Sequence, residues 1–509
     1  MIQLTGDNVD LDLIWKVAHG REKVGLSDGA RAVMTKSRAY IESALKSGKV
    51  IYGVNTGFGA LSSVRISDRD IHQLQKNLIR SHCAGVGAKF TIEETRAIMC
   101  LRANALARGH SGIRPLVVDK ILEFLNEDII PVVPSQGSVG ASGDLAPLAH
   151  LALAFIGEGE VWENGKPVHV LGVLKAKGIE PLTLEAKEGL SLINGCQVMT
   201  AVGMLNALRA RRLLWLTDLA GAISLEALRG SRAAFDPLIA ATRPHPGEAK
   251  TARNILKLLG PTSAIAESHE NCGKVQDAYS LRCMPAVHGA AKDALRHVVR
   301  VLETEANAST DNPLVFADED KVLSCGNFHG EPVAFALDYM GIAMSASASI
   351  SECRIEKLIN PAMSELPAFL APVAGLNSGL MMVQVAAAAL VSENKILSHP
   401  ASVDSIPTSA DKEDHVSMGT IAARKLGEIV KNAENVLAME LLTGCQALDL
   451  LKPLEPAAAV REAFKHIRTK VPFAQEDRVF ALDVQTIREM IETDELSRVV
   501  QKTVGDLEW

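Results

Sequence analysis

The chain has 509 residues, of which 47% are hydrophobic, and a formal net charge of −7. This composition excludes a disordered chain, and the length allows a large core and more than one structural unit. No block of basic residues occurs, so nucleic acid and anionic membranes are not expected partners.

Eight cysteines are scattered along the chain, and no two form a C-x-x-C pair or a zinc-type cluster with histidine. Scattered thiols in a long chain are typical of a reducing compartment. Residues 1–7 lack a basic region followed by an apolar run, so we expect no signal peptide. The sequence therefore predicts a cytoplasmic protein without a bound metal.

The first third of the chain mixes short elements with glycine-rich loops. We expect a helix over 30–46, a loop over 52–59, a helix over 71–79, and a hairpin near 161–170 that turns at Asn164-Gly165. Thr91 and Glu94 have the spacing of a capping box, in which each side chain satisfies a free backbone N–H of the other residue. The helix that follows should extend to about residue 108.

Residues 135–150 form the most unusual stretch, with glycines at 137, 140 and 143 around Ala141-Ser142-Gly143. Glycine permits positive φ and close approach of backbone atoms. The Gly143 nitrogen can therefore attack the Ala141 carbonyl carbon. Loss of two waters, one from the Ser142 side chain, would then leave an electrophilic five-membered ring.

The plain alternative is a polar turn before an apolar helix over 145–155. A phosphate-binding loop is excluded because no Gly-Lys-Ser/Thr follows, and a hydrolase elbow because Asp144 replaces its last glycine.

Long apolar helices dominate from about residue 185. Four segments of 18 residues or more, 201–228, 333–359, 380–397 and 416–448, predict a mainly α protein built on a central bundle of long helices. We expect a smaller N-terminal mixed domain over 1–185 that carries the serine loop, the bundle over 186–450, and a helical tail over 451–509. Helices that are apolar on most sides also favour oligomerisation over a thick single-chain bundle.

Polar groups stand out at loop-like positions against this background, where chemistry is usually placed. Each has a plain alternative: a core-capping tyrosine, a helix C-cap, a solvated stretch, a tight turn or a helix N-terminus. No single group outweighs its alternative, but together with Ala141-Ser142-Gly143 they do. They are Tyr52, Asn194-Gly195, Gln276 with Tyr279 and Arg282, Asn327-Phe328-His329, and Glu413-Asp414-His415.

Residues 137–148, Gly-Ser-Val-Gly-Ala-Ser-Gly-Asp-Leu-Ala-Pro-Leu, resemble the signature of the aromatic amino acid ammonia-lyases. The similarity extends from Tyr52 to about Leu448 and includes the motifs at 52–59, 192–195, 276–282, 309–313 and 326–329. The resemblance implies a fumarase/aspartase-like helical fold. It also implies a 4-methylidene-imidazol-5-one group (MIO) formed from Ala141, Ser142 and Gly143, with no external cofactor. A homotetramer with shared active sites is a further implication.

Within this family, Ser81-His82 and Glu413-Asp414-His415 resemble the histidine-directed members, whereas tyrosine- and phenylalanine-directed members usually carry His-Leu or Phe-Leu and a glutamine at these places. The resemblance therefore implies deamination of L-histidine to trans-urocanate and ammonia. A tyrosine or phenylalanine ammonia-lyase, or an MIO aminomutase, is the alternative.

The resemblance also implies roles for individual residues. The substrate amine adds to the MIO methylene in the usual family picture, and attack by the substrate ring is the rival; the sequence leaves both open. The implied roles are Tyr52 as the base, Arg282 as the ligand of the substrate carboxylate, Asn194 and Gln276 as hydrogen-bond partners of carboxylate or MIO, Tyr279 and Phe328 as walls of the MIO pocket, and His82 and Glu413 as readers of the imidazole.

Overall fold

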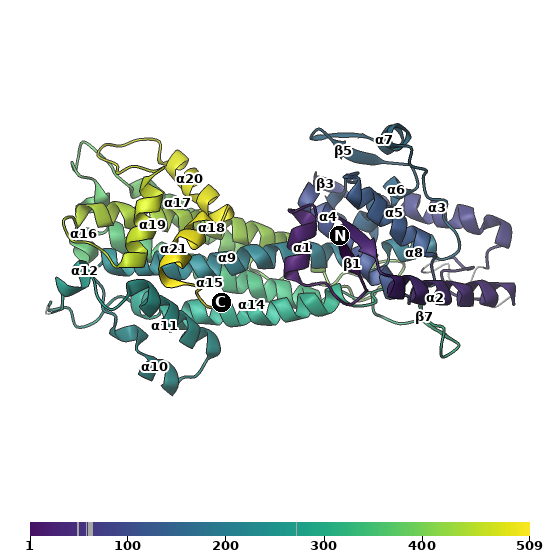
Figure 1. Ribbon diagram of the computed structural model, residues 1–509, viewed down its shortest axis with the longest axis horizontal. Coiled ribbons are helices and arrows are strands. Elements are labelled where there is room, and N and C mark those ends of the chain that lie inside the picture. Colours follow the sequence, from purple (N-terminus) through teal and green to yellow (C-terminus); the bar gives the residue numbers. More distant parts are fainter. Residues whose placement is uncertain (48–49, 58, 60–64, 271) are drawn as a thin grey trace. The chain divides into compact units, whose positions relative to one another are not determined.

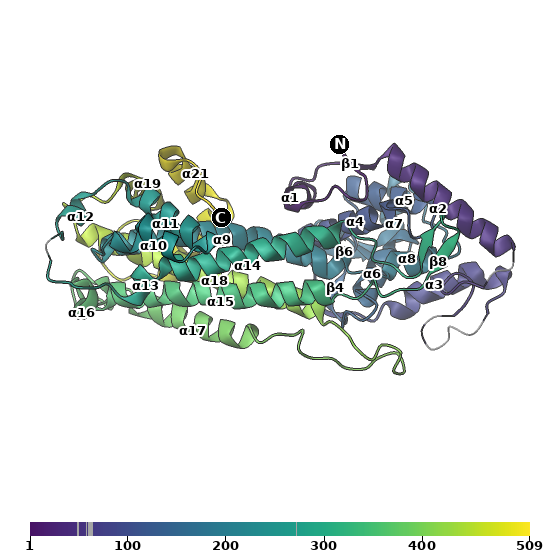
Figure 2. The same cartoon turned by 90° about the horizontal axis from the view of Figure 1, so that it is seen from below.

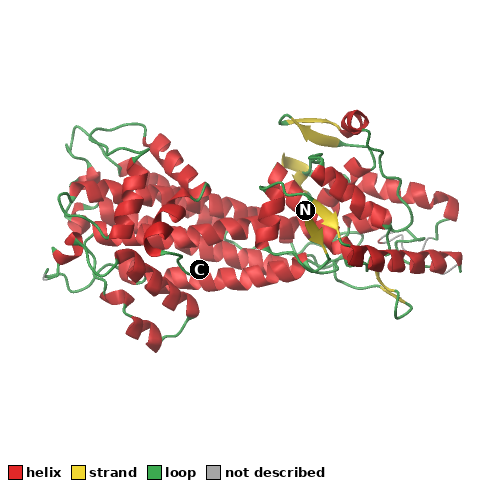
Figure 3. Cartoon of the chain, viewed as in Figure 1, coloured by secondary structure: helices red, strands yellow, loops and turns green. Residues whose placement is uncertain are grey.

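The structure is a computed structural model that describes residues 1–47, 50–57, 59, 65–270 and 272–509. Its contacts group into two compact units, each made of three segments. The first unit contains Met1–Leu205, Val299–Asp338 and Pro400–Arg424, and the second contains Asn206–Val298, Tyr339–His399 and Lys425–Trp509. Both are mainly helical, and every described strand lies in the first unit (Figure 3). The expected mainly α class is confirmed.

The first unit combines helices with small two-stranded sheets, several of whose strands are largely exposed. The parallel pair is β1 (Ile2–Leu4) with β2 (Val24–Leu26), and the antiparallel pairs are β3 (Val86–Lys89) with β4 (Pro134–Gln136), β5 (Glu160–Glu163) with β6 (Lys166–His169), and β7 (Leu314–Phe316) with β8 (Lys321–Leu323). The helices are α1 (Leu11–Ala18), α2 (Asp28–Lys46), α3 (Ile71–His82), α4 (Ile92–Ala107), α5 (Pro115–Asn126), α6 (Leu145–Phe155), α7 (Val170–Lys177) and α8 (Glu188–Ile193).

Local sequence signals account for several of these elements. The Thr91 hydroxyl accepts from the Glu94 N–H at 3.1 Å and the Glu94 carboxylate accepts from the Thr91 N–H at 2.8 Å, so the capping box at the start of α4 is confirmed. The hairpin β5–β6 turns at Asn164-Gly165, and both residues have positive φ as such a turn requires.

Four long helices, drawn in Figures 1 and 2, each have residues in both units: α9 (Gln197–Ala227), α14 (Met284–Ala306), α15 (Glu331–Ile359) and α18 (Gly419–Leu450). In the second unit, buried ionic contacts join them. Asp218 of α9 contacts His288 and Lys292 of α14, and Arg354 of α15 pairs with Glu440 of α18. The bundle core is therefore polar at this level, and each buried charge has a partner of opposite sign.

The remaining helices of the second unit are α10 (Pro237–Thr242), α11 (Pro246–Leu259), α12 (Ala264–Glu267), α13 (Tyr279–Arg282), α16 (Pro361–Ser364), α17 (Met381–Leu397), α19 (Ala458–Arg468), α20 (Phe480–Glu492) and α21 (Glu495–Val504). One helix, α15, is long and apolar enough to cross a membrane by length and composition, but 61% of its most apolar stretch is buried inside the protein. That burial is what a core helix of a bundle shows.

One long helix begins later than its apolar pattern indicates. Helix α18 starts at Gly419 rather than near 416 because Met418 has φ +56° and the residues before it contact the serine loop. The Met418 N–H donates to the Val139 carbonyl at 2.8 Å, and the Ser417 hydroxyl donates to the Gly140 carbonyl at 3.0 Å. A non-local contact therefore overrides helix propensity here.

Candidate active site

The serine loop, residues 137–144, is held in a conformation that only glycine adopts without strain. Gly140 and Gly143 have φ of +67° and +71°. Gly143 pairs with Gly195, and a Cβ atom on Gly143 would lie 2.2 Å from the Gly195 carbonyl oxygen. The chain therefore bends sharply on both sides of Ser142, as close approach of the 141 and 143 backbone atoms requires.

Asp144 anchors the end of this loop to the bundle. Its carboxylate is fully buried and accepts from the backbone N–H groups of Val198 and Met199, both at 3.0 Å, at the start of α9. It also accepts from the hydroxyls of Ser138 and Thr420. Burial raises the pKa of Asp144, and these hydrogen bonds oppose that effect.

Ser142 faces a cavity of about 620 Å³ in the first unit. Its described lining residues come from the loops around Tyr52, Ser142 and Glu413, from helix α3, from the start of α6, and from α8 and its junction with α9. Its polar lining residues are Tyr52, Asn77, Ser81, His82, Ser142, Asn194, Ser409 and Glu413. A cavity of this volume, in which polar side chains converge among apolar ones, is typical of a small-molecule site. Five of the predicted site residues therefore lie together: Tyr52, His82, Ser142, Asn194 and Glu413.

His82 ends helix α3 and has a defined proton position. Its Nδ1 atom lies 2.8 Å from the Leu78 carbonyl oxygen, which can only accept a hydrogen bond. The proton of the neutral ring is therefore on Nδ1, and Nε2 is left as a hydrogen-bond acceptor.

Glu413 contacts the serine loop although it is far from that loop in the sequence. Its Oε1 atom accepts from the Ser142 hydroxyl at 2.8 Å, and its Oε2 atom accepts from the Thr408 hydroxyl at 2.7 Å. Backbone hydrogen bonds between residues 408 and 413 close a turn at this point. The carboxylate is therefore fixed directly beside the residue on which the proposed chemistry depends.

Tyr52 comes from the first glycine-rich loop and lines the same cavity. Its hydroxyl oxygen accepts from the Gly59 N–H at 3.3 Å, which places the ring across its own loop. Phe58 of the motif at 52–59 lies outside the described residues.

Asn194 occupies the junction where α8 ends. It is the C-cap of that helix, and the buried Arg102 guanidinium donates to its carbonyl oxygen at 3.0 Å. Burial lowers the pKa of Arg102 to about 10. The side-chain Oδ1 of Asn194 is buried and accepts no hydrogen bond from any described residue. An unsatisfied buried acceptor that lines a cavity is expected where a ligand donates to it.

Gln276, Tyr279 and Arg282 lie together in the second unit. Helix α13 begins only at Tyr279, and Ala278 before it is extended with ψ 153°. The Arg282 guanidinium donates to the Gln276 side chain at 3.0 Å and lies 4.6 Å from the centre of the Tyr279 ring. Among the described residues no carboxylate pairs with Arg282, so its charge is available to a ligand.

Tyr279 is 71% exposed, and the described residues that line the cavity around Ser142 all belong to the first unit. Phe328 is half-buried in the first unit, where its carbonyl oxygen accepts from the Cys196 thiol at 3.0 Å. Phe328 is likewise not a lining residue of this cavity.

Sequence reasoning missed two residues that position Glu413. Thr408 binds its carboxylate, and Ser409 lines the cavity from the turn that precedes it. Ser409, Ala410 and Asp411 all have positive φ. A run of three left-handed residues without glycine has no sequence signature, and only Asp411 is of a type that favours it.

Comparison with known proteins agrees with this arrangement. Residues 9–469 match the family model described as aromatic amino acid lyase. The chain is 49% identical over 504 residues to the histidine ammonia-lyase of Myxococcus xanthus, covering 99% of both chains.

Among solved structures, the histidine ammonia-lyase of Trypanosoma cruzi matches with a TM-score of 0.92 at 43% identity, over 99% of this chain and 95% of that one. The tyrosine aminomutase of Streptomyces globisporus matches with a TM-score of 0.94 at 36% identity, over 100% and 99%. The fold and the sequence over nearly its whole length are those of a carbon–nitrogen lyase. The chain belongs to the aromatic amino acid lyase family.

Proposed function

We propose that the protein deaminates L-histidine to trans-urocanate and ammonia, with an MIO group formed from Ala141, Ser142 and Gly143. The hydrogen bond from Ser142 to Glu413, in the cavity that His82 also lines, carries this proposal. A carboxylate and an imidazole therefore share a cavity with Ser142, the serine of the Ala-Ser-Gly tripeptide. The histidine ammonia-lyases among the relatives, at about half identity, support the same substrate.

The residues present fit an MIO group. Glycine is required at 143 by its φ and by the Gly195 carbonyl, and the Asn194 Oδ1 atom beside the loop lacks a donor. The group would supply an electrophile that makes the substrate amine a better leaving group. Dehydration of Ser142 would remove the donor that Oε1 of Glu413 now has, so this oxygen would become free to accept from an imidazole N–H.

The rest of the cavity would then recognise the ring and its β-hydrogen. His82 offers Nε2 as an acceptor and Glu413 offers Oε1, so the two residues would fix the imidazole through its polar atoms. An apolar ring would leave both groups unpaired, which costs about 1–3 kcal/mol for each. Tyr52, on the same wall, would take the β-proton as the base.

Arg282 would bind the substrate carboxylate with its planar, two-pronged guanidinium. Gln276 and Tyr279 hold that guanidinium, and we propose that this group serves the cavity of another copy of the chain in a homotetramer. Exposure of Tyr279 and the absence of an ion-pair partner for Arg282 among the described residues support this arrangement. The eight free thiols favour the cytoplasm as the location.

Exchange of the two imidazole readers tests the substrate assignment. In His82→Leu with Glu413→Gln, kcat/KM for histidine should fall by about 10²-fold or more, because both polar contacts to the ring are lost. The measurement is urocanate absorbance under initial-rate conditions. Asp411→Asn, exposed and in the same turn, is the matched control and should keep histidine turnover. Unchanged histidine turnover in the double variant would contradict the assignment.

The structural match to a tyrosine aminomutase makes an aromatic aminomutase or tyrosine ammonia-lyase the second candidate. It differs in requiring a pocket that accepts a phenol rather than an imidazole. Assay of histidine, tyrosine and phenylalanine with the wild-type protein separates them, because each eliminated product has its own absorbance. A β-amino acid product would identify an aminomutase.

A further inference from the structure

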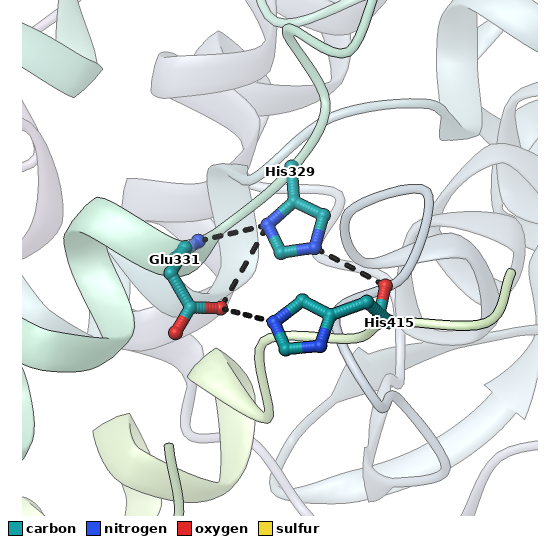
Figure 4. Close-up of side chains that lie close together, drawn as sticks. All are labelled: His329, Glu331 and His415. Carbon is teal, nitrogen blue, oxygen red and sulfur yellow. Dashed lines mark hydrogen bonds and ion pairs between the residues drawn. The ribbon is translucent and has the colours of Figure 1, made fainter. Parts of the chain in front are cut away.

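Three potential metal ligands lie close together in the first unit, although their spacing in the sequence does not indicate a metal site. Glu331 is the first residue of α15, and His329 lies just before it. His415 lies in the segment that leads to α18 (Figure 4). The Glu331 Oε2 atom is 3.9 Å from Nδ1 of His329 and 3.9 Å from Nε2 of His415. All three ligand atoms lie within 4.8 Å of one another, and the two imidazole rings are parallel.

His329 is oriented as a metal-binding histidine usually is. Its Nε2 atom lies 3.2 Å from the backbone carbonyl oxygen of His415. Because that oxygen only accepts, the proton of the neutral ring is on Nε2, and the lone pair of Nδ1 points toward Glu331. Metal-binding histidines typically donate their other ring N–H to a carbonyl or carboxylate in this way.

Glu331 lacks the partners that a buried carboxylate oxygen normally has. Its Oε2 atom is buried and accepts no hydrogen bond from the described residues. At 3.9 Å from each imidazole nitrogen it is too far for a hydrogen bond to either. An unpaired buried oxygen that faces two imidazole nitrogens without a hydrogen bond to either costs free energy unless a donor or a cation binds there.

We propose that His329, Glu331 and His415 bind a divalent cation of the zinc class. Two imidazoles and one carboxylate are a common zinc ligand set, whereas Mg²⁺ and Ca²⁺ prefer oxygen ligands only. Zinc bonds of about 2.0–2.1 Å in tetrahedral geometry place ligand atoms about 3.4 Å apart. The two 3.9 Å separations from Glu331 therefore need to close by about 0.5 Å, and the separation between the two histidine nitrogens, at most 4.8 Å, by up to about 1.4 Å. Water would complete the coordination because the His415 side chain is 69% exposed.

Two local costs accompany binding. The Glu331 backbone N–H now donates to Nδ1 of His329 at 3.3 Å, and a cation would take this lone pair. That N–H is one of the first-turn donors of α15, which have no partner within the helix and can bind water instead. The partial positive charge of the helix N-terminus opposes a cation, and the Glu331 carboxylate offsets it.

The consequence concerns the substrate pocket and rests on the proposed function. His329 follows Phe328 directly, and His415 is two residues from Glu413. A cation that joins these two segments would restrain both, so it would act as a positioning device for the imidazole reader. The cation itself does not need to contact the substrate.

Zinc binding to the full-length protein tests the site without any assay of turnover. After treatment with a chelator, the wild-type protein should bind one Zn²⁺ more per chain than Glu331→Gln or His415→Gln, measured by competition with a chromogenic zinc chelator. The affinity of this ion should fall at least about 10-fold in either variant, as for changes in the surroundings of metal sites. Because His415 is largely exposed, His415→Gln should fold normally, and its circular dichroism and Tm without metal should match the wild type.

His245→Gln, an exposed histidine outside the cluster, is the matched control and should bind zinc like the wild type. Zinc held only by cysteines would be equal in all four proteins. Equal stoichiometry and affinity across the four proteins would overturn the proposal, as would an anomalous zinc signal at another position. Neither result depends on whether histidine is the substrate, so failure of this site is distinguishable from failure of the proposed function.

Discussion

The hydrogen bond between Ser142 and Glu413 joins residues that are 271 positions apart in the chain. At the residue scale it explains why a glutamate at this place matters. A glutamine would still bind the Ser142 hydroxyl through its amide oxygen, but it would lack the charge that favours an imidazole N–H. We therefore expect a change at this position to alter the choice of substrate while the contact with the loop is kept.

Glu305, near the end of α14, gives the protein a pH-dependent stability. Burial raises the pKa of Glu305 from 4.5 to about 7, with a hydrogen bond from Cys196 acting against this shift. The folded state therefore keeps a proton that the unfolded state loses between these pH values. The contribution of this carboxyl group to the free energy of unfolding is fully present below pH 4.5. It is lost as the pH rises to about 7, by up to roughly 3 kcal/mol.

Glu305→Gln should flatten this dependence, because the neutral amide has no proton to lose. The measurement is the free energy of unfolding by denaturant at several pH values between 4.5 and 7. Exposed Glu428, changed to glutamine, is the control and should keep the wild-type slope. If the slope in Glu305→Gln equals that of the wild type, burial of this carboxyl is not its cause.

At the scale of elements, the site depends on where helices begin and end. His82 ends α3, Asn194 caps α8, and Asp144 binds the N-terminal N–H groups of α9. Helix termini present unsatisfied backbone groups, so they are natural anchors for loops and ligands. The pairing of Gly143 with Gly195 ties the segment that precedes α6 to the junction between α8 and α9.

Gly143→Ala tests that pairing. The new Cβ atom would lie 2.2 Å from the Gly195 carbonyl oxygen at a φ of +71°, so the loop must move. We expect no cyclisation and loss of activity, and a fall in stability of about 1–3 kcal/mol. Intact mass is the direct measurement, since cyclised wild-type protein should be two waters lighter than its encoded sequence.

Gly29→Ala is the control for this change, because a Cβ atom there meets nothing within 4 Å. It should keep both the reduced mass and the activity. Recovery of a Gly143→Ala protein that has lost two waters would show that the close contact with Gly195 is not needed for ring formation.

At the scale of the whole molecule, the proposed catalytic groups belong to two units. Tyr52, His82 and Glu413 line the cavity of the first unit, and Gln276, Tyr279 and Arg282 form a cluster in the second. Large apolar side chains of the second unit, including Met382, Val385 and Ile396 of α17, are exposed in the single chain. Contact with other copies would cover them and would bring the Arg282 cluster to a neighbouring cavity.

Mixed oligomers test whether sites are shared. Tyr52→Phe should lose about 10²–10⁴-fold of its activity as a base variant, and Arg282→Ala should lose activity through the substrate carboxylate. Co-expression of the two inactive chains should restore part of the activity, because some sites would combine a wild-type Tyr52 with a wild-type Arg282 from another copy. The separately purified variants, mixed without subunit exchange, are the control. Absence of restoration in verified mixed oligomers would place both residues in one chain's site.

The predicted family is confirmed, and so is the mainly α fold with its long helices. Helix α6 has the expected bounds, 145–155. The predicted domain boundaries at 185 and 450 and the roles of the site residues stay predictions. The predicted absence of a metal site rested on the spacing of residues that are close in the sequence. Such spacing cannot show that His329, Glu331 and His415 lie close together in space.

Local patterns were enough for the capping box at Thr91, the hairpin turn at Asn164, the helix periods and the glycines around Ser142, because each depends on atoms a few residues apart. The tertiary structure alone decided that Thr408 holds Glu413, that α18 starts late beside Val139, and that two histidines and a glutamate meet at the start of α15. Most of these contacts join segments that are far apart in the sequence. The contact between Thr408 and Glu413 depends on a turn with unusual backbone angles. Their free energy comes from packing the whole core, so no short stretch of residues encodes them.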